Sequence, residues 1–65
     1  MNLAEVAEYL STDVRGIFAR AARFDGGIHY PTRDYQNWLA DNRVLPSYCR
    51  EYVAYKLRIR ERESP

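Results

Sequence analysis

The side chains most often used for catalysis or metal binding in this chain are His29 and Cys49, its only histidine and its only cysteine. They lie twenty residues apart in the sequence, and neither has a second ligand at the short spacing typical of zinc sites. We expect His29 to pack beside aromatic residues. Cys49 lies on the apolar side of a predicted helix, where a thiol is usually buried and unreactive. The sequence therefore predicts neither a metal site nor a nucleophilic cysteine.

The carboxylates do not form a catalytic group either. Those in the first two thirds of the chain occur singly and are expected to cap helices or face solvent: Glu5, Glu8, Asp13, Asp25, Asp34 and Asp41. The glycine pair Gly26-Gly27 follows a predicted helix, whereas the glycines of phosphate-binding loops precede one. We therefore expect a protein that is not an enzyme and carries no cofactor.

A different chemistry is indicated by the arginines of segment 13–24. The apolar face of this predicted helix holds Val14, Ile17, Phe18 and Ala21. Guanidinium groups on the opposite face can bind phosphates or guanine edges, and small residues between them allow close approach. This pattern predicts a recognition helix in the major groove of double-stranded DNA, although a simply solvated helix face has the same composition. The predicted DNA contacts are Arg15, Gly16, Ala19, Arg20, Arg23 and, from the next helix, Arg33.

The elements that would position these arginines are mainly helical. Apolar spacing predicts four helices, at residues 3–10, 13–24, 33–42 and 47–61. The first two are separated only by Ser11-Thr12-Asp13, which favours a helix-turn-helix. Paired glycines should end the second helix, and Thr32 should cap the third. The predicted core consists of Leu10, Ile17, Phe18, Trp38, Leu39, Val53 and Leu57.

Two segments leave alternatives open. Ile28-His29-Tyr30, which ends at a proline, is compatible with a short β wing. Residues 52–60 alternate apolar and polar side chains as a strand would. We favour a helix for the latter because residues 47–62 contain no glycine or proline and follow Pro46-Ser47, a typical helix start.

The order of these segments resembles that of small winged helix-turn-helix proteins of the excisionase and MerR-like type. The similarity covers residues 3–40 and is carried by Val6-Ala7-Glu8-Tyr9-Leu10, Ile17-Phe18, Ile28-His29-Tyr30 and Trp38-Leu39. Ser11 stands where the turn of those proteins usually has glycine, and the wing is shorter and lacks basic residues. The resemblance implies a DNA-binding protein of a mobile element or a transcriptional regulator.

Composition sets the remaining bounds. With 65 residues, 46% hydrophobic and 29% charged, the chain fits one globular domain, residues 1–65. A single cysteine and the absence of a signal-peptide pattern or long apolar run predict a cytoplasmic protein that does not span a membrane. The net charge is only +1, so DNA binding depends on where the arginines lie.

A surplus of tyrosine favours a rival function. There are six tyrosines, and this residue is enriched at protein interfaces. Four residues of the last predicted helix follow a spacing close to a heptad and form a predicted protein interface: Tyr48, Tyr52, Tyr55 and Ile59. Such an interface would serve a homodimer, or a phage- or plasmid-type protein that binds and inhibits a host protein. The alternative is that the stripe packs inside the domain, as apolar stripes at helical spacing commonly do.

Overall fold

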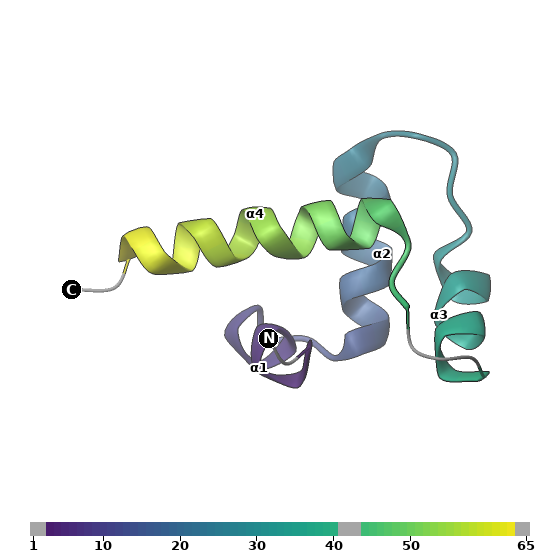
Figure 1. The fold of residues 1–65 in the computed structure, drawn as a ribbon, viewed down its shortest axis with the longest axis horizontal. Helices are drawn as coiled ribbons and strands as arrows, with labels where there is room; N and C mark the ends of the chain where they lie inside the picture. The colour runs from purple at the N-terminus through teal and green to yellow at the C-terminus, as the bar shows by residue number, and fades with distance from the viewer. Residues whose placement is uncertain (1–2, 41–43, 64–65) are drawn as a thin grey trace.

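The computed structural model describes residues 3–40 and 44–63, and these form four helices (Figure 1). They are α1 (Leu3–Tyr9), α2 (Val14–Asp25), α3 (Pro31–Ala40) and α4 (Ser47–Glu63). α2 lies at the centre and packs against each of the other three helices. α3 lies beside α2, α4 crosses it, and the C-terminal half of α4 extends away from α2 and α3 (Figure 1). The predicted mainly helical domain is therefore confirmed.

The turn between α1 and α2 has the geometry of a Schellman motif. The backbone N–H of Thr12 donates to the carbonyl of Ala7, and that of Ser11 donates to the carbonyl of Glu8. Ser11 takes up the left-handed conformation at φ 56°, which this motif requires and which glycine adopts most easily. Carbonyl groups at the end of α1 are thereby satisfied, and the chain turns sharply into α2.

Both ends of α2 are capped as its sequence predicts. The Asp13 side chain accepts a hydrogen bond of 2.8 Å from the backbone N–H of Gly16. At the other end Gly26 adopts φ 76° and its N–H donates to the carbonyl of Ala22. Because φ is positive there, glycine is the residue that fits without strain. The helix predicted at 13–24 is observed within one residue at each end.

The core lies where α2 meets α3 and α4. Phe18 is fully buried, and its ring contacts those of Tyr35 and Trp38 at centroid distances of 5.7 and 6.0 Å. Of the predicted core, Ile17, Phe18, Trp38 and Val53 are buried, while Leu10 and Leu57 are partly buried against them. Leu39 is 42% exposed and was wrongly placed in the core, because Trp38 occupies the inward position of that turn. The core also contains buried residues outside the predicted set, which are Val6, Ala7, Ala21, Tyr48, Cys49 and Tyr52.

Three further expectations are corrected or decided by the structure. α3 begins at Pro31, not after Thr32, and the carbonyl of Tyr30 accepts its first hydrogen bond, from Asp34; proline suits a first helical position. Its expected end at Asp41-Asn42 lies outside the described residues. α4 is helical to Glu63, so the strand alternative for 52–60 was wrong.

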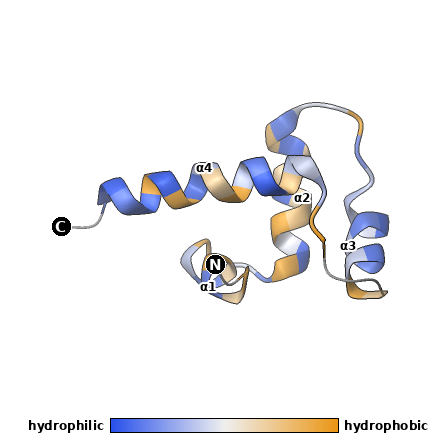
Figure 2. Cartoon of the chain, in the orientation of Figure 1, coloured by the Kyte–Doolittle hydropathy of each residue, from blue (hydrophilic) through white to orange (hydrophobic). Residues whose placement is uncertain are grey.

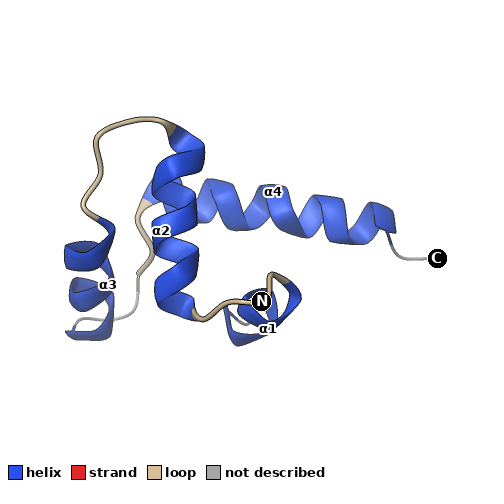
Figure 3. Ribbon diagram, turned by 180° about the vertical axis from the view of Figure 1, so that it is seen from behind, coloured by secondary structure: helices blue, strands red, loops and turns tan. Residues whose placement is uncertain are grey.

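The expected β wing is a loop. Residues 26–30 form no strand, and none occurs elsewhere in ranges 3–40 and 44–63 (Figure 3). The side chain of Ile28 in this loop is 87% exposed. The C-terminal half of α4 is mostly hydrophilic (Figure 2). None of the four helices combines the length and apolar character needed to cross a membrane.

Candidate nucleic-acid interface

The outer face of α2 carries a short cationic stripe. Arg15, Ala19 and Arg23 are all exposed and follow one another at intervals of four residues, so they lie on one side of the helix. At a rise of about 1.5 Å per residue, the two arginines are separated by roughly 12 Å along the axis. We call these three residues the α2 stripe. A helix held by three neighbours presents it on a rigid surface.

The two arginines of the α2 stripe keep their charge available. Within residues 3–40 and 44–63, Arg15 and Arg23 take part in no ion pair or hydrogen bond. The acidic residues at the ends of α2 are engaged elsewhere, since Asp13 caps the helix and Asp25 pairs with His29. A cation with no internal partner can bind a phosphate without first breaking an internal contact.

Arg20 was predicted to contact DNA, but the structure gives it an internal role. It is half-buried, and its guanidinium donates a hydrogen bond of 2.9 Å to the backbone carbonyl of Leu10. That carbonyl lies at the C-terminal end of α1, where a positive charge is favourable. Arg20 therefore joins α1 to α2. The sequence could not reveal this contact because its acceptor is a backbone atom ten residues away.

Gly16 was also predicted to lie at the DNA surface, and its role too is internal. A Cβ atom at this position would overlap the Oγ1 atom of Thr12. The residue is half-buried beneath the turn, so its lack of a side chain serves the packing of that turn. The close packing that a helical glycine suggests is present, but it is within the domain.

Arg33 lies on α3, apart from the α2 stripe. Its side chain is 66% exposed; its guanidinium lies over the Tyr30 ring, 4.7 Å from the centroid, and 3.5 Å from a carboxylate oxygen of Asp34. A shallow open depression connects the α2 stripe with the loop and the start of α3; its lining is Ala19, Ala22, Arg23, Gly26, Gly27, His29 and Pro31. Arg33 thus lies two residues beyond the edge of this depression.

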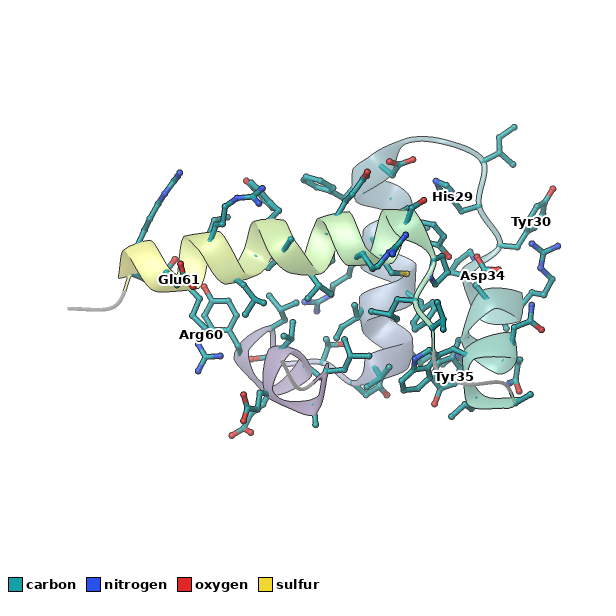
Figure 4. The ribbon with its side chains drawn as sticks, in the orientation of Figure 1. His29, Tyr30, Asp34, Tyr35, Arg60 and Glu61 are labelled. Carbon is teal, nitrogen blue, oxygen red and sulfur yellow. The ribbon has the colours of Figure 1, made fainter. Side chains whose placement is uncertain are left out.

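A polar cluster joins the loop to α3 and α4, and Figure 4 labels two of its members, His29 and Asp34. His29 Nε2 is 2.6 Å from an Asp25 carboxylate oxygen, and the His29 ring stacks on Tyr48 at a centroid distance of 4.0 Å. The Tyr48 hydroxyl donates a 2.6 Å hydrogen bond to Asp34. The bond to His29 lowers the pKa of Asp25. Burial, followed by the bond to Asp34, raises the pKa of Tyr48. These contacts hold the loop in place.

The only cysteine and the only histidine of the chain both lie in packed surroundings. Cys49 is completely buried, and burial raises the pKa of its thiol to about 11, so it stays protonated at neutral pH. His29 stacks on Tyr48, as its expected packing beside aromatic residues implies. Among residues 3–40 and 44–63, no three His, Cys, Asp or Glu side chains are grouped so as to hold a metal ion.

The predicted tyrosine interface is not an exposed stripe. Tyr48 and Tyr52 are each only 5% exposed, because α4 turns them toward α2 and α3. Ile59 is half-buried, and Tyr55 is the most exposed of the four, at 37%. The alternative that the stripe packs within the domain accounts for its first two members, so a four-residue interface on this face is wrong.

Sequence reasoning missed an exposed aromatic cluster at the C-terminal end of α2. Phe24 is 55% exposed and stacks on Tyr55 with ring centroids 5.0 Å apart. It also meets the buried Tyr52 at 5.5 Å. The available signal was that Phe24 follows Ile17 by seven residues and Ala21 by three, so it extends the apolar face to the end of α2, where a phenylalanine needs a partner from another element.

Comparisons with protein-family models, with curated proteins and with solved structures found no match to this chain. Function must therefore be argued from the surface itself.

Proposed function

We propose that this chain is a small DNA-binding protein, of the excisionase-like or regulatory kind, that places α2 in the major groove. The observation that carries the proposal is the α2 stripe: two exposed arginines that have no ion-pair or hydrogen-bond partner among residues 3–40 and 44–63, with an alanine between them. Guanidinium groups bind phosphates and guanine edges in two-point fashion, and alanine lets the helix approach the bases. Arg33 is the candidate for an additional phosphate contact.

The turn before α2 supports the same proposal. The resemblance to helix-turn-helix proteins places Ser11 where glycine is usual, and Ser11 adopts the left-handed conformation that glycine favours. Arg20 then fixes α2 relative to α1 through its hydrogen bond to the Leu10 carbonyl, while Asp13 caps the start of α2. A recognition helix needs such fixed placement, because base contacts tolerate little error in position.

The test measures binding to a fluorescently labelled duplex of random sequence. Fluorescence anisotropy reports the affinity at a series of salt concentrations. Each phosphate contact steepens the dependence of log affinity on log salt by about 0.9. The double variant Arg15→Ala/Arg23→Ala should therefore bind more weakly and lower that slope by roughly two. Both side chains are exposed, so the variant should keep the circular dichroism spectrum of the wild type.

A matched control removes the same charge elsewhere. Arg50 and Arg58 are exposed on α4, and Arg50→Ala/Arg58→Ala should leave the salt slope close to that of the wild type. Equal loss in both double variants would contradict a specific role for α2. Absence of duplex binding by the wild-type protein at low salt would refute the proposed function.

Binding of a partner protein, such as a host protein inhibited by a phage- or plasmid-type protein, is the second candidate. It is favoured by large apolar side chains left exposed in a small domain, with Ile28 at 87% and Val44 at 64%. Complex formation with such a partner should be insensitive to Arg15→Ala/Arg23→Ala and should be weakened by Ile28→Ser. Duplex binding that disappears with the α2 stripe would favour the first candidate.

A further inference from the structure

The exposed aromatic cluster at the end of α2 differs from an ordinary covered core. Phe24 and Tyr55 stack with an angle of 27° between their ring planes, and they are 55% and 37% exposed. Tyr52 lies beneath them, 5% exposed, with its ring tilted by 60° to that of Phe24. We call Phe24 and Tyr55 the aromatic platform. It offers open ring surface on a base of buried tyrosine.

One cation lies against these rings, and two arginines are close to them in sequence. The Lys56 ammonium lies 5.7 Å from the Tyr52 centroid and 5.8 Å from that of Tyr55. Arg23, of the α2 stripe, directly precedes Phe24, and the exposed Arg58 follows Tyr55 by three residues on α4. The nearby carboxylates are fewer: Asp25 is held by His29, and Glu51 precedes Tyr55 by one turn. The platform is thus suited to an anionic ligand that carries a flat ring.

We infer that the aromatic platform stacks against an unpaired nucleobase next to the duplex bound by α2. Aromatic rings with cations beside them are the usual arrangement for binding single-stranded nucleic acid, because rings stack on bases while cations bind the phosphates. Arg23 belongs to the α2 stripe and directly precedes Phe24 in α2, so both surfaces lie at the C-terminal end of the same helix. The inference rests on the proposed function for delivery of the nucleic acid, and it extends the ligand to DNA with a frayed or single-stranded end.

The experiment compares two labelled probes: a blunt duplex of about one and a half helical turns, and the same duplex with a short thymidine overhang. Anisotropy should give an affinity for the overhang probe about tenfold higher, the change expected of one stacked base. The variant Phe24→Leu/Tyr55→Leu keeps apolar cover over Tyr52 but removes both rings. It should bind both probes with the affinity that the wild type has for the blunt one.

Two controls separate stacking from folding. Tyr30→Leu removes an exposed aromatic ring from the loop and should preserve the overhang preference. Phe24→Tyr keeps a ring at the platform and should also preserve it. If the double leucine variant lowers the melting temperature, Phe24→Leu alone serves as the test, because Tyr55 continues to cover Tyr52. Loss of the overhang preference in Tyr30→Leu would overturn the inference. So would an unchanged overhang preference in a folded Phe24→Leu protein.

The outcomes distinguish this inference from the proposed function. Equal wild-type affinity for both probes refutes the platform and leaves duplex binding by α2 intact. Binding to the overhang probe alone, lost on removal of the rings, supports the platform and refutes duplex binding by α2. If sedimentation shows the free protein to be an oligomer that Phe24→Leu/Tyr55→Leu dissociates, the rings form a protein interface and the inference is wrong.

Discussion

Single residues in this domain often serve the fold where their type suggests a ligand. Arg20 has the chemistry of a phosphate-binding residue but donates to the Leu10 carbonyl. Gly16 has the small size of a groove-facing residue but leaves room for Thr12. Sequence spacing assigns a residue to one side of a helix, and it does not identify the atom across from it. Three of the residues assigned to the DNA surface, Arg15, Ala19 and Arg23, are exposed on α2, and their contact with DNA stays a prediction.

Tyr48 provides a prediction at this scale. Its hydroxyl donates to Asp34 within a nearly buried site, so Tyr48→Phe should lower the free energy of unfolding at neutral pH by about 1–3 kcal/mol. Burial and the bond to Asp34 raise the pKa of Tyr48 in the folded protein. Its contribution is therefore complete below the unfolded value of about 10 and is lost as pH rises above it.

Urea unfolding of wild type and Tyr48→Phe from neutral pH to about pH 11 measures both effects. The difference between the two proteins should narrow at the alkaline end. Tyr30→Phe, at an exposed tyrosine, should show little difference at any pH. A Tyr48→Phe difference that stays constant across the range would contradict the linkage.

At the scale of elements, local sequence signals predicted the helices well and their surroundings poorly. Asp13 and Gly26 cap α2 where the sequence places them, since capping depends on atoms within a few residues. The loop at residues 26–30 and the exposure of Leu39 depend on distant contacts. His29 is held by Tyr48, which lies on the last helix, and no local pattern predicts such a contact.

The α1–α2 turn gives a prediction for an element. Ser11 is the only non-glycine residue with positive φ among those described, and this conformation costs a residue with a Cβ about 1–2 kcal/mol. Glycine removes that strain, but it also gives the unfolded chain more conformational freedom, which lowers the stability of the folded state by about 0.5–1 kcal/mol. Ser11→Gly should therefore stabilise the protein by about 0.5–1 kcal/mol in urea unfolding.

Ser47 is the matched control for this turn. It is the first residue of α4 and has no positive φ, so Ser47→Gly gains no relief of strain and should destabilise the protein slightly. Stabilisation by both glycines, or destabilisation by Ser11→Gly, would show that the turn is not the source of the effect.

At the scale of the whole molecule, α2 has two roles. Its inner face forms part of the core, and its outer face holds the α2 stripe. A net charge of +1 hides this division, because acidic residues elsewhere in the chain offset the arginines of the α2 stripe. Glu5 and Glu8 of α1 line a depression with Tyr9 and Arg60. The Tyr9 hydroxyl also donates a hydrogen bond of 2.8 Å to the carboxylate of Glu63. This bond joins the projecting end of α4 to α1. Composition alone could not show such segregation.

The packing of α4 against α2 predicts which tyrosines of α4 can be replaced by a charged residue without unfolding the protein. Tyr52 is 5% exposed and packs under Phe24, whereas Tyr55 is 37% exposed. Tyr52→Glu would bury an unpaired carboxylate, and a domain of this size rarely has more than about 3–5 kcal/mol of stability to lose. We expect this variant to be largely unfolded by circular dichroism at any concentration, and Tyr55→Glu to remain folded.

Sedimentation equilibrium at two protein concentrations distinguishes this result from the tyrosine interface that the sequence favours. If that interface joined two copies, Tyr52→Glu would yield a folded monomer from a wild-type dimer. If Tyr52 is a core residue, the variant loses its helical circular dichroism signal. It does so whether the wild-type protein is a monomer or a dimer. A folded Tyr52→Glu protein would contradict the packing of α4 against α2, on which the placement of the α2 stripe depends.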